Sequence, residues 1–265
     1  MSERIKNNKI IRTKTSYSNE GLVFGRHPVL ELLDCGLQIK KIILSLSTQG
    51  SIIQEIIDAA QNAGVRIERV KRDYFEKRFR NLNHQGVAAE FELPKQYELK
   101  DVLNSCSDKK DVCIIILDGI EDPRNFGAIV RTAQALGIDA IITRNRRSAG
   151  ISPSAVKSSA GALLTYPCVF VSNLNYAIGE LKKNDFWIYG LESDVDKSIW
   201  GVDLLGKTAM VFGGEGSGLS RLTKEKCDEL LSIPMSGKMS SLNVSVAVSL
   251  SIGEFVRQVN KDRGL

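Results

Sequence analysis

Hydrophobic positions after residue 111 follow a repeating order of strands and helices. The uninterrupted apolar run 112–117 predicts a buried central strand of a parallel sheet, and helical spacing follows over 126–136 until Gly137. Similar patterns predict strands at 140–143, 169–171, 186–191 and 208–212, and helices at 153–160, 176–181, 219–230 and 241–259. This alternation predicts an α/β fold with a mostly parallel sheet that is covered on both faces.

A smaller α/β pattern precedes this region. It predicts helices at 28–33 and 52–60 and strands at 41–44, 65–70 and 86–91. A polar stretch opened by Pro94 follows, with one short amphipathic piece. The expected division is a flexible basic arm 1–18, an N-terminal domain 19–93, a linker 94–110 and a C-terminal domain 111–265.

The net charge of +5 has an uneven distribution along the chain. Residues 1–18 hold five basic side chains and one acidic side chain, so the remainder is nearly neutral. Two local clusters, the basic residues within 66–80 and the trio Arg144, Arg146 and Arg147, have the charge to hold phosphates. The alternative interpretation is that both clusters are solvated charged surfaces.

Composition excludes several classes of protein. No apolar run approaches the roughly 20 residues of a membrane span, and the basic N-terminus has no apolar segment typical of a secretory signal. The chain has five cysteines, which is an odd number, and no two of them have CxxC spacing. They predict reduced thiols in the cytoplasm, mostly buried, and neither a disulfide framework nor a zinc site.

The first candidate motif lies at 125–131, where a strand and a loop lead into a helix. Asn125 is placed to cap that helix, and Gly127 and Arg131 share one helical face because they are four residues apart. The glycine leaves room for a ligand to approach, and the guanidinium can reach it. An ordinary cap, a packing glycine and a surface arginine would give the same pattern.

The second candidate motif is the glycine-rich segment 213–218, which directly follows a predicted strand. Glycines at this place let the backbone approach a ligand closely. The segment lacks the closing Lys of a phosphate-binding P-loop, and Leu219 stands where a dinucleotide fingerprint needs glycine. Glu215 would repel a phosphate and suits a hydroxyl or a cation better. The alternative is a tight turn with a solvent-facing glutamate.

The third candidate motif is the segment 233–245. Pro234 and Gly237 frame a loop that returns to a helix beginning near Ser241, with Asn243 close to the free backbone N–H groups of that helix. The helix is rich in small residues, which permit close packing of backbones. Taken alone, the segment is also compatible with an ordinary capped helix.

Together, in this order, the three motifs closely resemble those of the SpoU/TrmH family of knotted methyltransferases. The resemblance covers about 111–260, and residues 25–29 and 84–87 resemble the substrate-binding domain of members that modify 23S rRNA. It implies a deep trefoil knot in the C-terminal sheet and a small N-terminal RNA-binding domain. It also implies a homodimer that methylates a ribose 2′-hydroxyl of RNA, most specifically of a guanosine in 23S rRNA. The implied methyl donor is S-adenosylmethionine, and no metal is required.

The resemblance also assigns roles to single residues. Arg131 matches the catalytic arginine. Since an arginine pKa exceeds about 12, we assign it to stabilising the developing alkoxide, with a substrate phosphate taking the proton. Glu215, Ser241 and Asn243 match residues that position the arginine, ribose and cofactor, and Asn125 matches one that holds the arginine or substrate. Contacts with S-adenosylmethionine, largely through the backbone, are expected from Gly213, Ile233 and Leu242.

Several alternatives remain open at the level of sequence. His84 and Gln85 either lie on an RNA-binding surface or serve a turn structurally. The substrate could instead be a tRNA or the rRNA site whose methylation gives thiostrepton-type resistance. A catalytically silent RNA-binding protein of ribosome assembly would be expected to lack at least one of the matched polar residues, and all of them are present. The missing dinucleotide fingerprint disfavours a Rossmann oxidoreductase.

Overall fold

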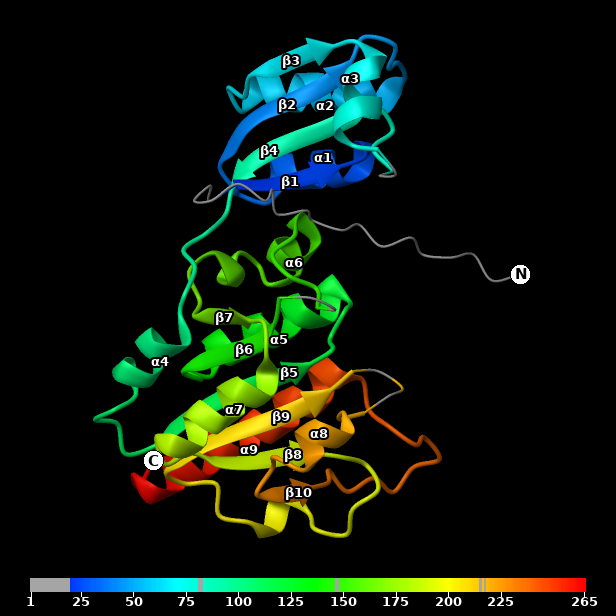
Figure 1. The fold of residues 1–265 in the computed structure, drawn as a ribbon. Coiled ribbons are helices and arrows are strands. Elements are labelled where there is room, and N and C mark those ends of the chain that lie inside the picture. Colours follow the sequence, from blue (N-terminus) through cyan, green and yellow to red (C-terminus); the bar gives the residue numbers. More distant parts are fainter. Residues whose placement is uncertain (1–19, 81–82, 146–147, 215, 217) are drawn as a thin grey trace. The chain divides into compact units, whose positions relative to one another are not determined.

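The computed structural model describes residues 20–80, 83–145, 148–214, 216 and 218–265. The predicted arm 1–18, the candidate Glu215 and the basic residues Arg146 and Arg147 lie outside these residues. The chain forms two compact units (Figure 1). The first contains the described residues up to Lys95 together with Ile151–Lys157, and the second contains Gln96–Gly150 and Ser158–Leu265.

The first unit is built on a four-stranded sheet of order β1-β4-β2-β3, in which only β2 and β3 are parallel. Its predicted helices and strands are all present. Two further elements, β1 and α3, were not predicted. The many charged residues of α3 obscured its helical pattern in the sequence, although Phe75 and Phe79 are four residues apart and both are buried. The elements are β1 (Glu20–Phe24), α1 (Arg26–Asp34), β2 (Ile39–Ser45), α2 (Ser51–Asn62), β3 (Ile67–Val70), α3 (Arg72–Arg78) and β4 (Val87–Glu92).

The second unit is built on a fully parallel six-stranded sheet of order β10-β8-β9-β5-β6-β7. The prediction of a buried central strand is confirmed, because every residue of β5 is buried. The strands are β5 (Val112–Asp118), β6 (Ala140–Arg144), β7 (Cys168–Val171), β8 (Trp187–Leu191), β9 (Lys207–Gly213) and β10 (Glu229–Leu231). The helices are α4 (Leu99–Ser105), α5 (Pro123–Ala135), η1 (Ala162–Leu164), α7 (Leu174–Lys183), η2 (Ile199–Gly201), α8 (Arg221–Lys224) and α9 (Val244–Asp262). The short helix α6 (Pro153–Ser158) belongs, except for its last residue, to the first unit.

Helices cover both faces of this sheet, as the apolar pattern predicted. In Figure 1, α7 lies in front of the strands and α9 lies behind them. The apolar side of α7 packs on alternate residues of β5, including Ile114 and Ile116. α9 packs against β9 and against α5, so the first and third motifs belong to neighbouring helices. The parallel strands therefore end between two layers of helices, where α/β proteins commonly bind ligands.

Two predicted helices differ from the structure. The expected helix 219–230 is a short helix, α8, followed by the edge strand β10, because Glu229–Leu231 pairs in parallel with β8. Helical periodicity in a short apolar run cannot reveal such pairing with a distant strand. The last helix begins at Val244, three residues later than expected. Its N-cap is Asn243, whose side chain accepts a hydrogen bond from the Ser245 backbone N–H.

The stretch 94–110, expected as a linker, contains α4, whose Val102 is buried in the core of the second unit together with the neighbouring Cys106. All five cysteines are free thiols, and three of them are buried. Burial raises the pKa of Cys113 and Cys168 and raises the pKa of Cys227 to about 12, so these thiols remain protonated near neutral pH. Within the described ranges, no helix is long and apolar enough to cross a membrane.

Candidate active site

The carboxyl ends of β5 and β9 form the centre of the candidate site. These strands are neighbours, yet the chain leaves β5 toward β6 and leaves β9 toward β10, on opposite sides of the sheet. Such a reversal opens a crevice at the carboxyl ends, which is where open parallel sheets bind ligands. Asp118 and Gly213 are the last residues of the two strands and are register partners. The glycine-rich motif therefore begins at the expected binding position.

Gly213 is required by a close approach of two backbone segments. A Cβ atom at this position would lie 2.1 Å from the Gly218 carbonyl carbon and 2.4 Å from the Leu219 nitrogen. The loop turns back directly onto the strand end, and Gly218 N donates a hydrogen bond to Gly214 O over 3.2 Å. No side chain fits at Gly213, so this part of the site is lined by backbone.

The buried Asp118 and the half-buried Glu192 fix the end of the glycine-rich loop, and sequence analysis assigned a role to neither. Asp118 Oδ2 accepts hydrogen bonds from Thr223 Oγ1 (2.7 Å) and Ser220 N (3.4 Å). Glu192 accepts from Leu219 N over 2.8 Å. The sequence signal that could have identified them is an acidic residue at the end of an apolar strand. A carboxylate in such a position needs hydrogen-bond partners. The two carboxylates hold the chain that leaves the loop.

The structure joins the first and third motifs directly. Asn243 Nδ2 donates a hydrogen bond to Asn125 Oδ1 over 3.1 Å, across 118 positions of sequence. The Asn243 amide is itself oriented, because its Oδ1 accepts from the backbone N–H and the hydroxyl of Ser245. Two amides are thus held at the adjoining starts of α5 and α9, where they can orient a hydroxyl or an arginine.

The prediction that Asn125 caps α5 is wrong. The N-cap is Asp122, whose side chain accepts a hydrogen bond from Arg124 N over 2.8 Å, and Pro123 begins the helix. Proline is favoured at this position because it lacks the N–H that would otherwise need a partner. Asn125 therefore lies inside the first turn of α5, and its side chain is available for Asn243.

Arg131 and Ser241 are placed close to this region without being fixed in it. Arg131 is exposed on α5, one turn after the buried Gly127. Ser241 is exposed in the segment that precedes α9. Neither side chain has a hydrogen bond or an ion pair to any part of the chain that the structure describes. Both side chains are exposed, so a ligand can reach them.

The remaining two candidates for cofactor contacts lie on the segments around β10 and α9. Ile233 is half-buried just after β10, and Leu242 is 37% exposed just before the Asn243 cap. Ser232, the neighbour of Ile233, is hydrogen-bonded through its backbone to Ile199 and Lys197. The structure anchors the chain beside Ile233 and beside Leu242. Over the described ranges, no group of three His, Cys, Asp or Glu side chains could hold a metal ion.

His84 has a structural role in the first unit. Its ring stacks on Phe75 with centroids 4.8 Å apart, and its Nδ1 accepts a hydrogen bond from Gly86 N over 3.0 Å. Gln85 adopts a positive φ of 49°, and its side chain accepts from Arg26 N over 3.3 Å. Of the two interpretations left open by the sequence, these contacts favour a turn held by His84.

We expect His84 to make the stability of the chain dependent on pH. Burial lowers the pKa of His84, and protonation would also remove the acceptor that Gly86 N uses. The stabilisation is therefore complete above the unfolded pKa of about 6.5 and is lost as pH falls through the lower folded pKa. In denaturant titrations between about pH 7.5 and about pH 5, His84→Asn should show a weaker decline in unfolding free energy than the wild type.

The matched control is His27→Asn, which changes the exposed histidine of α1. This variant should retain the wild-type pH dependence. An equal decline in His84→Asn and the wild type would contradict the structural role of the neutral imidazole.

Comparison with known proteins gives a consistent family assignment. The profile of the SpoU rRNA Methylase family matches residues 112–253. The profile described as RNA 2′-O ribose methyltransferase substrate binding matches residues 22–97. The two profiles together cover most of the chain, and their boundary falls near Gln96, where the second compact unit begins.

Similar proteins include two named 23S rRNA (guanosine-2′-O-)-methyltransferase RlmB. That of Xylella fastidiosa is 38% identical over 82% of this chain and 88% of its own length. That of Escherichia coli is 34% identical over 89% of this chain and 98% of its own length. Among solved structures, the SpoU methyltransferase AviRb from Streptomyces viridochromogenes, in complex with AdoMet, matches with a TM-score of 0.60 and 25% identity over 91% of both chains.

Proposed function

The chain belongs to the SpoU rRNA methylase family, and we propose from this premise that it methylates the ribose 2′-hydroxyl of a guanosine in 23S rRNA. It is an RNA 2′-O-methyltransferase, and its methyl donor is S-adenosylmethionine. The choice of 23S rRNA rests on the relatives named RlmB, which match nearly the whole chain and not its catalytic part alone.

The hydrogen bond between Asn125 and Asn243 is the observation that carries the proposal. It brings the first and third motifs to one place, beside the helix that holds Arg131 and close to the strand end at Gly213. A reaction between a bound ribose and a bound methyl donor needs orienting groups and a charge-stabilising group in one region. Fixed amides, the exposed Arg131 guanidinium and a backbone-lined loop support such a region.

The residues at the strand ends fit the proposed cofactor. Its methionine part is zwitterionic and its adenine ring is planar, so backbone groups and apolar surface suit it better than a charged pocket. The tight turn at Gly213 offers backbone, and Ile233 and Leu242 offer partly exposed apolar side chains. We propose that these residues hold it. S-adenosylmethionine supplies an electrophilic methyl group on a sulfonium, and the departing thioether is neutral.

The chain's own residues align and activate the ribose. Arg131 is placed to stabilise the developing 2′-alkoxide, while a phosphate of the substrate accepts the proton, because a guanidinium remains protonated. Asn243 and Ser241 orient the ribose and the cofactor, and Asn125 fixes the Asn243 amide. Glu215 lies outside the described residues, and its proposed role in positioning Arg131 rests on the family resemblance.

The proposal includes a homodimer and a trefoil knot. Val246 is 46% exposed and Leu250 is 41% exposed, one turn apart on α9, and a second copy would cover this apolar stripe. β10 is the edge strand, yet the chain returns from it to α9, which packs on β9 and α5 near the middle of the sheet. This return across the strand ends is compatible with a chain that passes through a loop of the knot.

Free thiols and an rRNA substrate favour the cytoplasm as the location of the protein.

Ribose-methylation mapping tests the substrate. Purified chain with S-adenosylmethionine and unmodified 23S rRNA should methylate one guanosine 2′-hydroxyl, and tRNA under the same conditions should remain unmodified. Deleting the gene should remove the same mark from total RNA. Methylation of tRNA alone would show that tRNA, and not 23S rRNA, is the substrate. Absence of both methylation and cofactor binding would favour a catalytically silent RNA-binding protein.

A further inference from the structure

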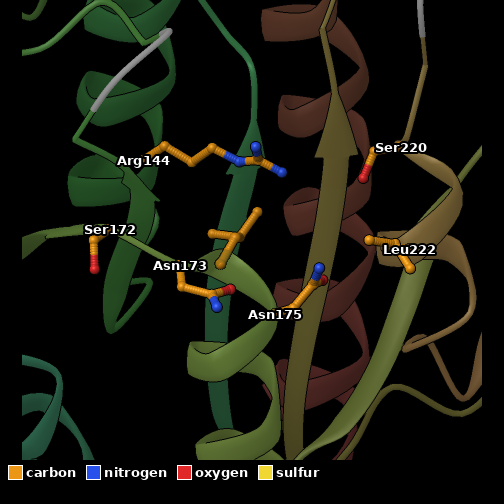
Figure 2. A pocket seen from close by; sticks show the side chains of 7 residues that line it. Arg144, Ser172, Asn173, Asn175, Ser220 and Leu222 are labelled. Atoms are coloured by element: carbon orange, nitrogen blue, oxygen red, sulfur yellow. The ribbon is translucent and has the colours of Figure 1, made fainter.

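A pocket of about 380 Å³ lies beside the candidate active site. It is formed by the end of β6, the start of α7 and the start of α8. Figure 2 shows Arg144 on one wall and Ser220 with Leu222 on the opposite wall, with Asn173 and Asn175 between them. Ser172 and Leu174 complete the lining. None of the residues matched to the family motifs line this pocket.

Arg144 supplies the pocket with a positive charge that is held in place. Its Nη2 lies 2.8 Å from Asp118 Oδ1, and the Asp118 side chain is only 6% exposed, whereas that of Arg144 is 32% exposed. The carboxylate is also bound by Thr223 and Ser220, so it points into the protein. The charge that a ligand meets is therefore the guanidinium. Within the described residues, Arg144 Nε is buried without a hydrogen-bond partner.

The start of α7 adds to this character. Asn173 is the N-cap, and its side chain accepts a hydrogen bond from Tyr176 N over 3.2 Å. The N–H groups of the first helical turn have no partners inside the helix, and the helix dipole favours an anion there. Asn175 Oδ1 is a second buried atom for which the described part of the chain provides no partner. A buried donor and a buried acceptor around one pocket thus have no partner among the described residues.

We propose that this pocket binds a nucleotide of the RNA substrate next to the methylated one, an inference that rests on the proposed function. A phosphate oxygen accepts from the Arg144 guanidinium and from the start of α7, while a ribose hydroxyl or a base N–H donates to Asn175. Leu222 is 54% exposed and offers an apolar contact for the base. A free nucleotide has the same chemistry. The RNA strand fits better because Ser220 and Asp118 connect the pocket to the loop at Gly213.

The test introduces negative charge at exposed lining positions that take no part in the ion pair. Ser172→Glu and Leu222→Glu alter opposite walls, and Ser107→Glu is the matched control, since Ser107 is exposed after α4, before the amino end of β5. Each pocket variant should bind a 23S rRNA fragment about tenfold more weakly at about 0.1 M salt, with a salt slope reduced by about one. Affinity for S-adenosylmethionine and RNA binding by Ser107→Glu should equal those of the wild type.

Binding and turnover separate the possible failures. Unchanged RNA affinity and salt slope in both pocket variants would overturn the pocket assignment, even if the wild type methylates 23S rRNA. Absence of methylation by the wild type would instead overturn the proposed function. A calorimetric titration with guanosine monophosphate distinguishes a nucleotide of the RNA strand from a free nucleotide. Saturable binding that Ser172→Glu abolishes, with unchanged RNA affinity, would assign the pocket to a free nucleotide and overturn the RNA assignment.

Discussion

Arg131→Ala should reduce methyl transfer by a factor of roughly 10² to 10³ or more while leaving the affinity for S-adenosylmethionine unchanged. Loss of one preorganised donor that stabilises developing negative charge has an effect of about this size. Arg131 is exposed on α5 and has no partner in the described part of the chain, so its removal breaks no contact with those residues. Single-turnover methylation of 23S rRNA measures the first quantity, and calorimetry with S-adenosylmethionine measures the second.

Two further variants locate the cause of the loss. Arg131→Lys keeps the charge but not the planar fork of donors, so its activity should lie between those of the wild type and the alanine variant. Arg263→Ala removes another exposed arginine, at the carboxyl end of α9, and should retain full activity. Near-normal turnover by Arg131→Ala would refute the assignment of the catalytic arginine.

Gly213→Ala should lower both the affinity for S-adenosylmethionine and the unfolding free energy. The added Cβ would meet the Gly218 carbonyl carbon at 2.1 Å and the Leu219 nitrogen at 2.4 Å. These are backbone atoms, so the loop must move and cannot relieve the contact by a side-chain rotation. Overpacking of this kind costs about 1–3 kcal/mol. Because the Leu219 backbone N–H donates to Glu192, displacement of the loop also disturbs this hydrogen bond.

The control for this change is Gly179→Ala, inside α7. A Cβ at Gly179 meets no atom within 4 Å, and alanine favours a helix over glycine by about 0.5–1 kcal/mol, so this variant should be slightly more stable than the wild type. Calorimetry with the cofactor and denaturant unfolding measure both effects. Wild-type affinity and stability in Gly213→Ala would show that the two backbone segments do not meet as described.

Several features of the fold follow from local sequence patterns. The apolar run of β5 predicted a central strand, and the alternation of strands and helices predicted a parallel sheet covered on both faces. These features are set by burial, which acts on each segment separately. The elements that were missed or misjudged were those in which charges hide a buried face, as in α3, or in which a strand depends on a distant partner, as in β10.

The sequence by itself determined the order and spacing of the three motifs, and with them the family and the candidates Arg131, Gly213 and Asn243. Only the tertiary structure decided which of these groups meet. It joined Asn125 to Asn243 and released Asn125 from the predicted cap. It also revealed that Asp118 anchors both the glycine-rich loop and Arg144. Such contacts arise from the register of neighbouring parallel strands and from the packing of α5 on α9. Asn125 and Asn243 are 118 positions apart, and Asp118 and Ser220 are 102 positions apart, so no local periodicity encodes these contacts.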